Sequence, residues 1–267
     1  MIGSDHFRNR TAALVCGLVV LVSGAMSPSR AIGQAAAESG SSQDALNMYG
    51  DAANFQNNGA FELAVEEWGK FLKRFPDDPL APKARHYLGV CNLQLKRFAD
   101  AAAAFQTVVQ DHPKIDVIQD AYLNLGWCQY SLGGQNVEGM YAKASDTFGE
   151  LVTKFPDGKH TDQALFFMGE ADYKRNAKKE AVAAYAQLVG ECPESSLRAD
   201  ALYALGVTRE ELGQYKEAGT AYKAFLEEFP ESELATEVEM RVAETVASSV
   251  PIPARCSAPS SCSEVAP

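Results

Sequence analysis

Residues 201–230 read ALYALGVTREELGQYKEAGTAYKAFLEEFP, in which a Gly, an Ala, an aromatic residue and a Pro follow one another at fixed spacing. The same spacing of Ala, aromatic residue and Pro occurs five times along the chain. The five sets are Ala64/Trp68/Pro76, Ala101/Phe105/Pro113, Ala144/Phe148/Pro156, Ala181/Tyr185/Pro193 and Ala218/Tyr222/Pro230. A pattern repeated at this length is typical of a solenoid, in which each unit buries its apolar face against its neighbours.

A Gly stands thirteen residues after each of the first four Pro residues, at Gly89, Gly126, Gly169 and Gly206, and Ala243 takes this place after the fifth. Consecutive Pro residues lie 37, 43, 37 and 37 positions apart. This spacing leaves room for two short helices per unit, each of about 12–15 residues with its turn. The third unit has six extra residues, which we expect in a loop around 131–139, where loop-forming residues gather.

The recurring Gly, Ala and Pro residues are expected to be the structural positions of the repeat. A Gly inside a helix costs about 0.5–1 kcal/mol relative to Ala, so its recurrence needs a structural reason. We expect the first helix of each unit to touch the second at this Gly, and the aromatic residue to fill the gap between neighbouring hairpins.

These patterns predict an all-α protein, a right-handed solenoid of about five helical hairpins with a C-terminal capping helix. The expected units span 44–78, 79–115, 116–158, 159–195 and 196–232, and the cap spans 233–248. A short flexible segment is expected at 34–43. A tail rich in Pro, Ser and Ala, expected to be disordered, occupies 249–267.

The N-terminus resembles a secretory signal peptide. A basic start precedes the uncharged run 12–22, and small residues follow it. The run is shorter than the roughly 20 residues that cross a bilayer. We expect cleavage within 31–35, removal of residues 1–33, and export to the periplasm. The alternative, a buried N-terminal helix, is disfavoured by Gly17, Gly24 and Pro28.

The charge balance disfavours two classes of partner. The chain carries 24 Lys and Arg against 35 Asp and Glu, a formal net charge of −11. Nucleic-acid affinity depends on basic side chains that neutralise phosphates, and anionic membrane surfaces attract the same side chains. We therefore expect no nucleic-acid partner, and no transmembrane segment in the mature chain.

Three motifs resemble the tetratricopeptide repeat. Each is followed by Ala-x-x-x-aromatic and Pro, and they are Leu202-x-x-Leu205-Gly206, Leu165-x-x-Met168-Gly169 and Tyr122-x-x-Leu125-Gly126. The usual tetratricopeptide unit has 34 residues, whereas this one has 37. Sequences such as Phe155-Pro156-Asp157 extend the resemblance to exported bacterial members of the family. These include the lipoprotein subunit of the outer-membrane β-barrel assembly machine and the periplasmic protein associated with the Tol–Pal system.

The resemblance implies a non-enzymatic scaffold that holds a protein or peptide in its concave groove, in outer-membrane or peptidoglycan assembly or maintenance. Carried over by the repeat register, the groove residues are Tyr49, His86, Trp127, Tyr130, Phe166, Tyr173 and Tyr203. Trp127 and Tyr130 are expected to be partly exposed. An alternative is that some of these rings pack against neighbouring helices, and Phe166 fits either place. A further alternative is a cell-wall glycan that stacks on the groove aromatics.

The sequence offers no catalytic or metal-binding constellation. His6, His86, His112 and His160 lack the spacing of a metal site and are expected at the surface or in turns. The chain contains neither a nucleophile elbow nor a glycine-rich phosphate loop, so we expect no enzymatic activity and no cofactor. Cys91 and Cys128 are expected to be small buried residues. For Cys256 and Cys262 in the tail, both a disulfide and free thiols remain open.

Overall fold

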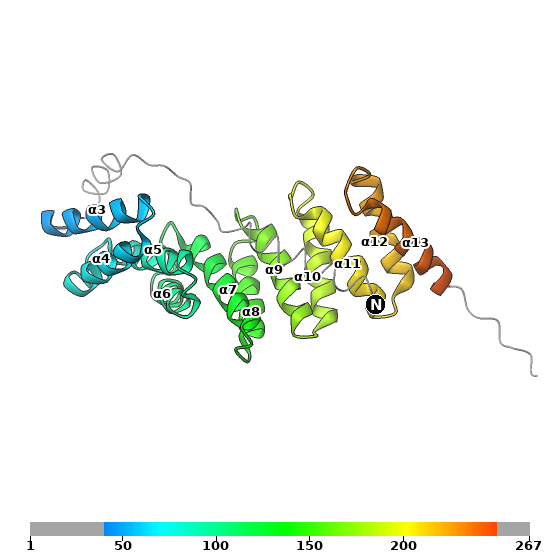
Figure 1. Ribbon diagram of the computed structural model, residues 1–267, viewed down its shortest axis with the longest axis horizontal. Coiled ribbons are helices and arrows are strands. Elements are labelled where there is room, and N and C mark those ends of the chain that lie inside the picture. The colour runs from blue at the N-terminus through cyan, green and yellow to red at the C-terminus, as the bar shows by residue number, and fades with distance from the viewer. Residues whose placement is uncertain (1–39, 250–267) are drawn as a thin grey trace, which may run out of the picture.

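The computed structural model describes residues 40–249, and within this range the protein is entirely helical (Figure 1). The expected signal peptide and the tail residues Cys256 and Cys262 lie outside the described residues. No helix between residues 40 and 249 has the length and apolar character needed to cross a membrane. The prediction of an all-α fold is confirmed.

The helices form five antiparallel pairs and one final helix, labelled as in Figure 1. The pairs are α3 (Gln43–Asn57) with α4 (Phe61–Arg74), α5 (Ala81–Gln94) with α6 (Phe98–Asp111), α7 (Ile118–Gly134) with α8 (Met140–Lys154), α9 (Thr161–Lys174) with α10 (Lys178–Glu191), and α11 (Arg198–Glu211) with α12 (Tyr215–Glu228). Helix α13 (Ala235–Ser249) ends the stack.

Each hairpin has a residue with a positive φ two positions after its first helix ends, and the third hairpin has a second one at Gly139. The five residues are Gly59, Lys96, Asn136, Asn176 and Gly213, with φ between 57° and 74°. Gly and Asn tolerate this left-handed conformation, which ends a helix and reverses the chain. The turn residues therefore specify the hairpins locally, with Lys96 as the exception to the preferred residue types.

The repeat prolines lie in the turns that join one hairpin to the next. Each stands two positions after the last residue of a second helix and is exposed to solvent, and they are Pro76, Pro113, Pro156, Pro193 and Pro230. The sequence analysis named them, with the recurring Ala and Gly, as structural positions of the repeat, and in the structure the prolines lie in turns whereas the Ala and Gly lie within helices. The middle Ala of every repeat is completely buried.

The position of the prolines has a physical reason. A Pro lacks the backbone N–H that a continuing helix needs, and it disfavours helical geometry in the residue before it. It can therefore end a helix from an exposed position without contacting the core. The prolines set the length of each unit, and the packing between helices depends on the other repeat positions.

The stack is elongated and curves toward the first helix of each pair (Figure 1). Each helix packs chiefly against the helices before and after it in the chain. The first helices α5, α7 and α9 also contact one another, and no second helix contacts another second helix as extensively within the described range. Because the first helices approach more closely, their side of the stack is the concave side.

The recurring Gly lies beneath the recurring aromatic ring of its own hairpin. A Cβ built at Gly126 would lie 2.5 Å from Phe148, and one at Gly169 would lie 2.5 Å from Tyr185. The predicted contact between the two helices at this Gly is therefore confirmed. The ring fills the space inside its hairpin, because only a residue without a side chain leaves room for it there. Some of these rings also meet the next hairpin, as expected: Trp68 of α4 stacks on Tyr87 of α5 with ring centroids 5.7 Å apart.

The extra residues of the third unit are only partly a loop. Helix α7 continues to Gly134, and the connection to α8 spans 135–139. The helix continues because Gly133 lies under the ring of Tyr141, where an added Cβ would be 2.9 Å from the ring. The loop-forming composition around residue 133 therefore indicated a break where the backbone stays helical.

The apolar core of the described residues consists of two clusters, one in α3, α4 and α5 and a larger one from α5 to α13. The ring at each of the five aromatic repeat positions is fully buried, beginning with Trp68 and ending with Tyr222. Cys91 and Cys128 are buried free thiols, as the sequence predicted.

Candidate functional site

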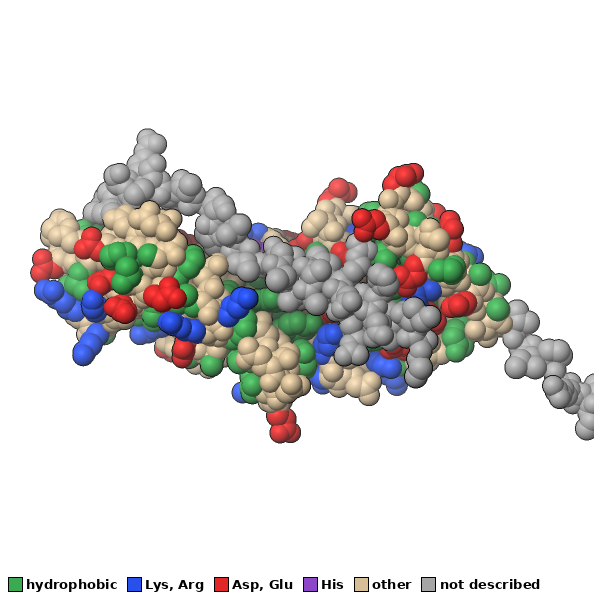
Figure 2. All heavy atoms as spheres, viewed as in Figure 1, with side chains coloured by type: hydrophobic (Ala, Val, Ile, Leu, Met, Phe, Trp, Pro, Cys, Tyr) green, Lys and Arg blue, Asp and Glu red, His purple; other side chains and the backbone are tan. Residues whose placement is uncertain are grey.

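The concave side is formed by residues of α3, α5, α7, α9 and α11, and these helices carry all seven predicted groove residues. Charged side chains of both signs are interspersed at the two ends of the molecule (Figure 2). Many of them are paired, for example Lys83 with Asp116 at 2.7 Å and Lys178 with Glu211 at 3.1 Å. Aromatic side chains therefore distinguish this side of the stack more than net charge does.

Helix α7 carries an aromatic cluster at the centre of the concave side. Trp127 stacks on Tyr130 with ring centroids 5.7 Å apart and an interplanar angle of 16°. Phe167 of α9 meets the edge of Trp127 at 5.2 Å, and Tyr141 of α8 meets Tyr130 at 5.3 Å. Trp127 keeps partial exposure, as expected. Tyr130 is only 7% exposed, contrary to expectation, because these neighbouring rings cover it.

Four of the seven predicted groove residues are buried, namely His86, Tyr130, Phe166 and Tyr203. His86 is 1% exposed and contacts the rings of Phe105 and Tyr87, each at 5.5 Å. Burial lowers the pKa of His86 to about 4, so its ring is neutral at pH 7. The expectation of a surface or turn histidine was wrong for His86. Phe166 is 2% exposed and packs against Phe167 and Tyr185, so of its two possible places it takes the core.

The remaining groove candidates are half-buried or anchored by hydrogen bonds. Tyr49 packs edge-on against Trp68 at 4.8 Å. The hydroxyl of Tyr173 donates to Glu211 at 2.8 Å, and that of Tyr203 donates to Glu237 at 2.7 Å. These bonds fix the rings, and partner binding by them stays a prediction.

Three acceptors serve the polar rings of the repeat, and the sequence analysis missed them. Wherever the repeat ring carries a hydrogen-bond donor, a residue on the first helix of the same hairpin accepts a hydrogen bond from it. Trp68 donates to Gln56 at 3.0 Å, Tyr185 to Glu170 at 2.6 Å and Tyr222 to Glu210 at 2.8 Å. Gln56 and Glu210 occupy the same register position, four residues after Ala52 and Gly206. This shared register is a signal from which Gln56 and Glu210 could have been found, whereas Glu170 directly follows Gly169 and lies at a different register position.

A second polar cluster joins the third and fourth hairpins. Asp120 of α7 lies 2.9 Å from His160 Nε2 and 2.7 Å from Lys159 Nζ. Burial raises the pKa of Asp120, but hydrogen bonds from His160 and Lys159 outweigh burial and hold this pKa at about 2. His160 lies in the turn before α9, in agreement with the expectation of a surface or turn histidine, and its side chain is buried at 9% exposure.

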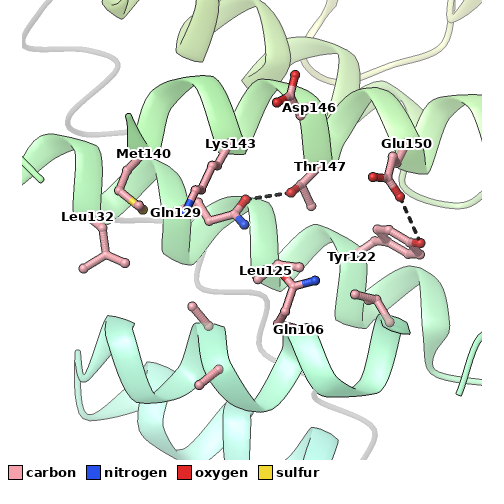
Figure 3. A pocket seen from close by; sticks show the side chains of 13 residues that line it. Gln106, Tyr122, Leu125, Gln129, Leu132, Met140, Lys143, Asp146, Thr147 and Glu150 are labelled. Atoms are coloured by element: carbon pink, nitrogen blue, oxygen red, sulfur yellow. Dashed lines mark hydrogen bonds between the residues drawn. The ribbon is translucent and has the colours of Figure 1, made fainter. Parts of the chain in front are cut away.

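A pocket of about 380 Å³ opens on the opposite side of the stack, between α6, α7 and α8 (Figure 3). Leu125 and Leu132 of α7 and Met140 of α8 line it together with polar groups. Thr147 donates to Gln129 at 2.7 Å across its wall. The sequence analysis did not anticipate this pocket, because it depends on how two successive hairpins are spaced.

The geometry is that of a helical-repeat scaffold with an aromatic concave side. In residues 40–249 no group of three or more His, Cys, Asp or Glu side chains is arranged to hold a metal ion. Tetratricopeptide repeat models match residues 52–114 and residues 120–158, 163–195 and 200–232. The chain therefore belongs to the tetratricopeptide repeat family, whose fold implies protein or peptide partners.

Solved structures with the same fold share little sequence with the chain. A tetratricopeptide repeat protein from Parabacteroides merdae is 15% identical, with a TM-score of 0.59 over 78% of this chain and 75% of that one. YrrB, described as a TPR protein with an unusual peptide-binding site, is 17% identical, with a TM-score of 0.57 over 80% and 98%. MamA from Desulfovibrio magneticus is 16% identical, with a TM-score of 0.56 over 70% and 95%. No curated protein matches the sequence.

Proposed function

We propose that this protein is an exported, non-enzymatic scaffold that binds a protein or peptide on the concave side of its helical stack. The observation that carries the proposal is the aromatic cluster on α7, in which Trp127 is stacked on Tyr130 and keeps partial exposure. A rigid aromatic side chain that is held in place and partly exposed is a typical anchor for a binding partner.

The proposed setting is the periplasm, in outer-membrane or peptidoglycan assembly or maintenance. Its support is the signal-like N-terminus and the Phe-Pro-Asp sequences shared with exported bacterial tetratricopeptide proteins. YrrB has a peptide-binding site, which supports a peptide as the class of partner. Periplasmic fractionation and N-terminal sequencing test the setting: a mature chain that begins within 32–36 is expected, and an uncleaved cytoplasmic chain contradicts it.

The Trp127→Ala variant tests the binding site. Tagged wild-type protein and the variant are each incubated with an envelope extract, and the retained proteins are identified by mass spectrometry. We expect Trp127→Ala to lose partners that the wild type retains. Leu63→Ala is the matched control, because Leu63 is a 48% exposed apolar residue on α4, away from the cluster. Identical retained sets for the wild type and Trp127→Ala contradict the proposal.

A glycan ligand is the alternative that this chemistry supports, because flat aromatic faces also stack on sugar rings. Sedimentation with purified peptidoglycan separates the two. Protein that pellets with peptidoglycan in a Trp127-dependent manner, and captures no protein, identifies the glycan as the ligand.

A further inference from the structure

Glu170 is a buried carboxylate with one unused oxygen at the centre of the concave side. It lies on α9 and is 1% exposed. Its Oε1 accepts the hydroxyl of Tyr185 at 2.6 Å. Its Oε2 has no hydrogen-bond partner among the described residues. A buried polar atom without a partner is costly, so its presence calls for a functional explanation.

Tyr185 contacts this carboxylate directly, and the charge of Glu170 acts on three further tyrosines. The four tyrosines are Tyr130 of α7, Tyr141 of α8, Tyr173 of α9 and Tyr185 of α10, and burial together with the charge of Glu170 raises the pKa of each. Tyr130 stacks in turn on Trp127. Trp127, Tyr141 and Tyr173 are only half-buried, so their rings are accessible to a ligand on this side of the stack.

We propose that Glu170, with the rings of Trp127, Tyr130 and Tyr173, forms a subsite for the cationic side chain of a Lys or Arg in a bound peptide. This inference rests on the proposed function, since it names the chemistry of the same concave side. Aromatic faces attract a cation through their quadrupole, and an ionised carboxylate oxygen accepts a charge-assisted hydrogen bond from it. Both requirements meet at Glu170, whereas an anionic or purely apolar side chain satisfies neither.

The surrounding charges set the pH range of the subsite. Burial raises the pKa of Glu170 to about 7, the bond from Tyr185 and the charge of Lys174 oppose this, and Asp200 of α11 adds to it. Lys174 acts on Glu170 through its charge, and among residues 40–249 the Oε2 atom of Glu170 has no hydrogen-bond partner. The carboxylate is therefore increasingly ionised above neutral pH, and a cation should bind more tightly at pH 8 than at pH 6.

An NMR titration of the full chain tests the subsite with two small probes of nearly equal shape. Nα-acetyl-lysine methylamide carries the cation, and Nα-acetyl-norleucine methylamide lacks it. The readout is the indole N–H signal of Trp127, assigned with a Trp127→Phe variant. The chain has 2 Trp residues, and the other, Trp68, is fully buried.

We expect the lysine probe, and not the norleucine probe, to shift the Trp127 signal. Glu170→Gln should weaken lysine-probe binding by about tenfold, because it replaces a charge-assisted hydrogen bond by a neutral one. Glu150→Gln, on the exposed face of α8, should bind like the wild type. Circular dichroism verifies that each variant is folded.

Equal shifts with both probes, or unchanged binding in folded Glu170→Gln, would overturn the proposal. Its failure is separable from failure of the proposed function. If Trp127→Ala loses captured partners but Glu170→Gln does not change probe binding, the proposed peptide groove is supported and the cation subsite is contradicted. If the lysine probe binds in a Glu170-dependent manner but no protein is captured, the cation subsite is supported and the proposed protein-binding function is contradicted.

Discussion

Pairs of residues, one on each helix of a hairpin, define how a unit packs. The Gly on the first helix makes room for a ring from the second, and the first helix also provides an acceptor where that ring carries a donor. Tyr222 shows both features, since it lies over Gly206 and donates to Glu210. A buried hydroxyl without an acceptor would cost about 1–3 kcal/mol, so a Tyr at this position requires its partner.

Opposite effects are expected from adding a methyl group at two glycines. At Gly206 a new Cβ would overlap the ring of Tyr222, so Gly206→Ala should lower the free energy of unfolding by about 1–3 kcal/mol. At Gly69, within α4, an added Cβ meets nothing within 4 Å, so Gly69→Ala should raise it by about 0.5–1 kcal/mol. Urea denaturation measures both. Equal effects at the two sites would contradict the ring-over-glycine packing.

The pH dependence of stability should reveal Glu170. Its folded-state pKa of about 7 lies above its ordinary value of 4.5, so its contribution to stability is present at low pH and is lost as pH rises toward 7. His86, with a pKa lowered to about 4, acts in the opposite sense over the same range, because its contribution is lost as pH falls.

The Glu170→Gln variant removes the first of these contributions. The difference in unfolding temperature, variant minus wild type, should therefore increase steadily between pH 5 and pH 7.5. Thermal unfolding by circular dichroism at several pH values measures this difference. A difference that is constant with pH would show that Glu170 does not carry the raised pKa.

The sequence predicted the helices themselves better than it predicted where they end and which side chains pack between them. The Ala, Gly and Pro positions predicted the hairpins, because each residue type has a local backbone or packing reason at its place. The extension of α7 could not be predicted, since Gly133 stays helical only through its contact with Tyr141, eight residues later. The burial of His86 depends likewise on the rings of Phe105 and Tyr87, contacts that the repeat spacing does not specify.

The last helix is fastened to the stack by Arg241. Its guanidinium binds Glu210 of α11 at 3.0 Å and Glu237 of α13 at 3.1 Å, and it lies over the ring of Tyr203. The Arg241 side chain is only 13% exposed. The capping helix thus uses a largely desolvated charge where earlier hairpins use an apolar ring.

Two arginines should differ in their effect on stability. Arg241→Ala should lower the free energy of unfolding by about 1–3 kcal/mol, because it leaves partly buried carboxylates without their partner. Arg74 pairs with Asp44 at 3.1 Å, but both side chains are largely exposed. Arg74→Ala should therefore change the free energy of unfolding by less than about 1 kcal/mol. Chemical denaturation compares the two. Similar losses would contradict the role of Arg241 in holding the cap.

The whole molecule is a curved stack whose two sides offer different surfaces. The concave side carries Trp127 and the tyrosines around Glu170, and the opposite side carries the pocket between α6, α7 and α8. The repeat register predicted seven groove residues, and all of them lie on the first helices of the hairpins. It could not predict which of these side chains stay exposed, because that depends on rings contributed by the next hairpin. The pocket was equally beyond prediction, since it arises between hairpins.

Site-specific photo-crosslinking tests most directly whether partners bind on the concave side. A photoreactive amino acid is introduced at Tyr173 on the concave side or at Asp146 beside the opposite pocket, and each protein is irradiated in the native envelope. We predict crosslinked partners from position 173 and none from position 146. Crosslinks from position 146 alone would contradict binding on the concave side and would assign the partner to the pocket.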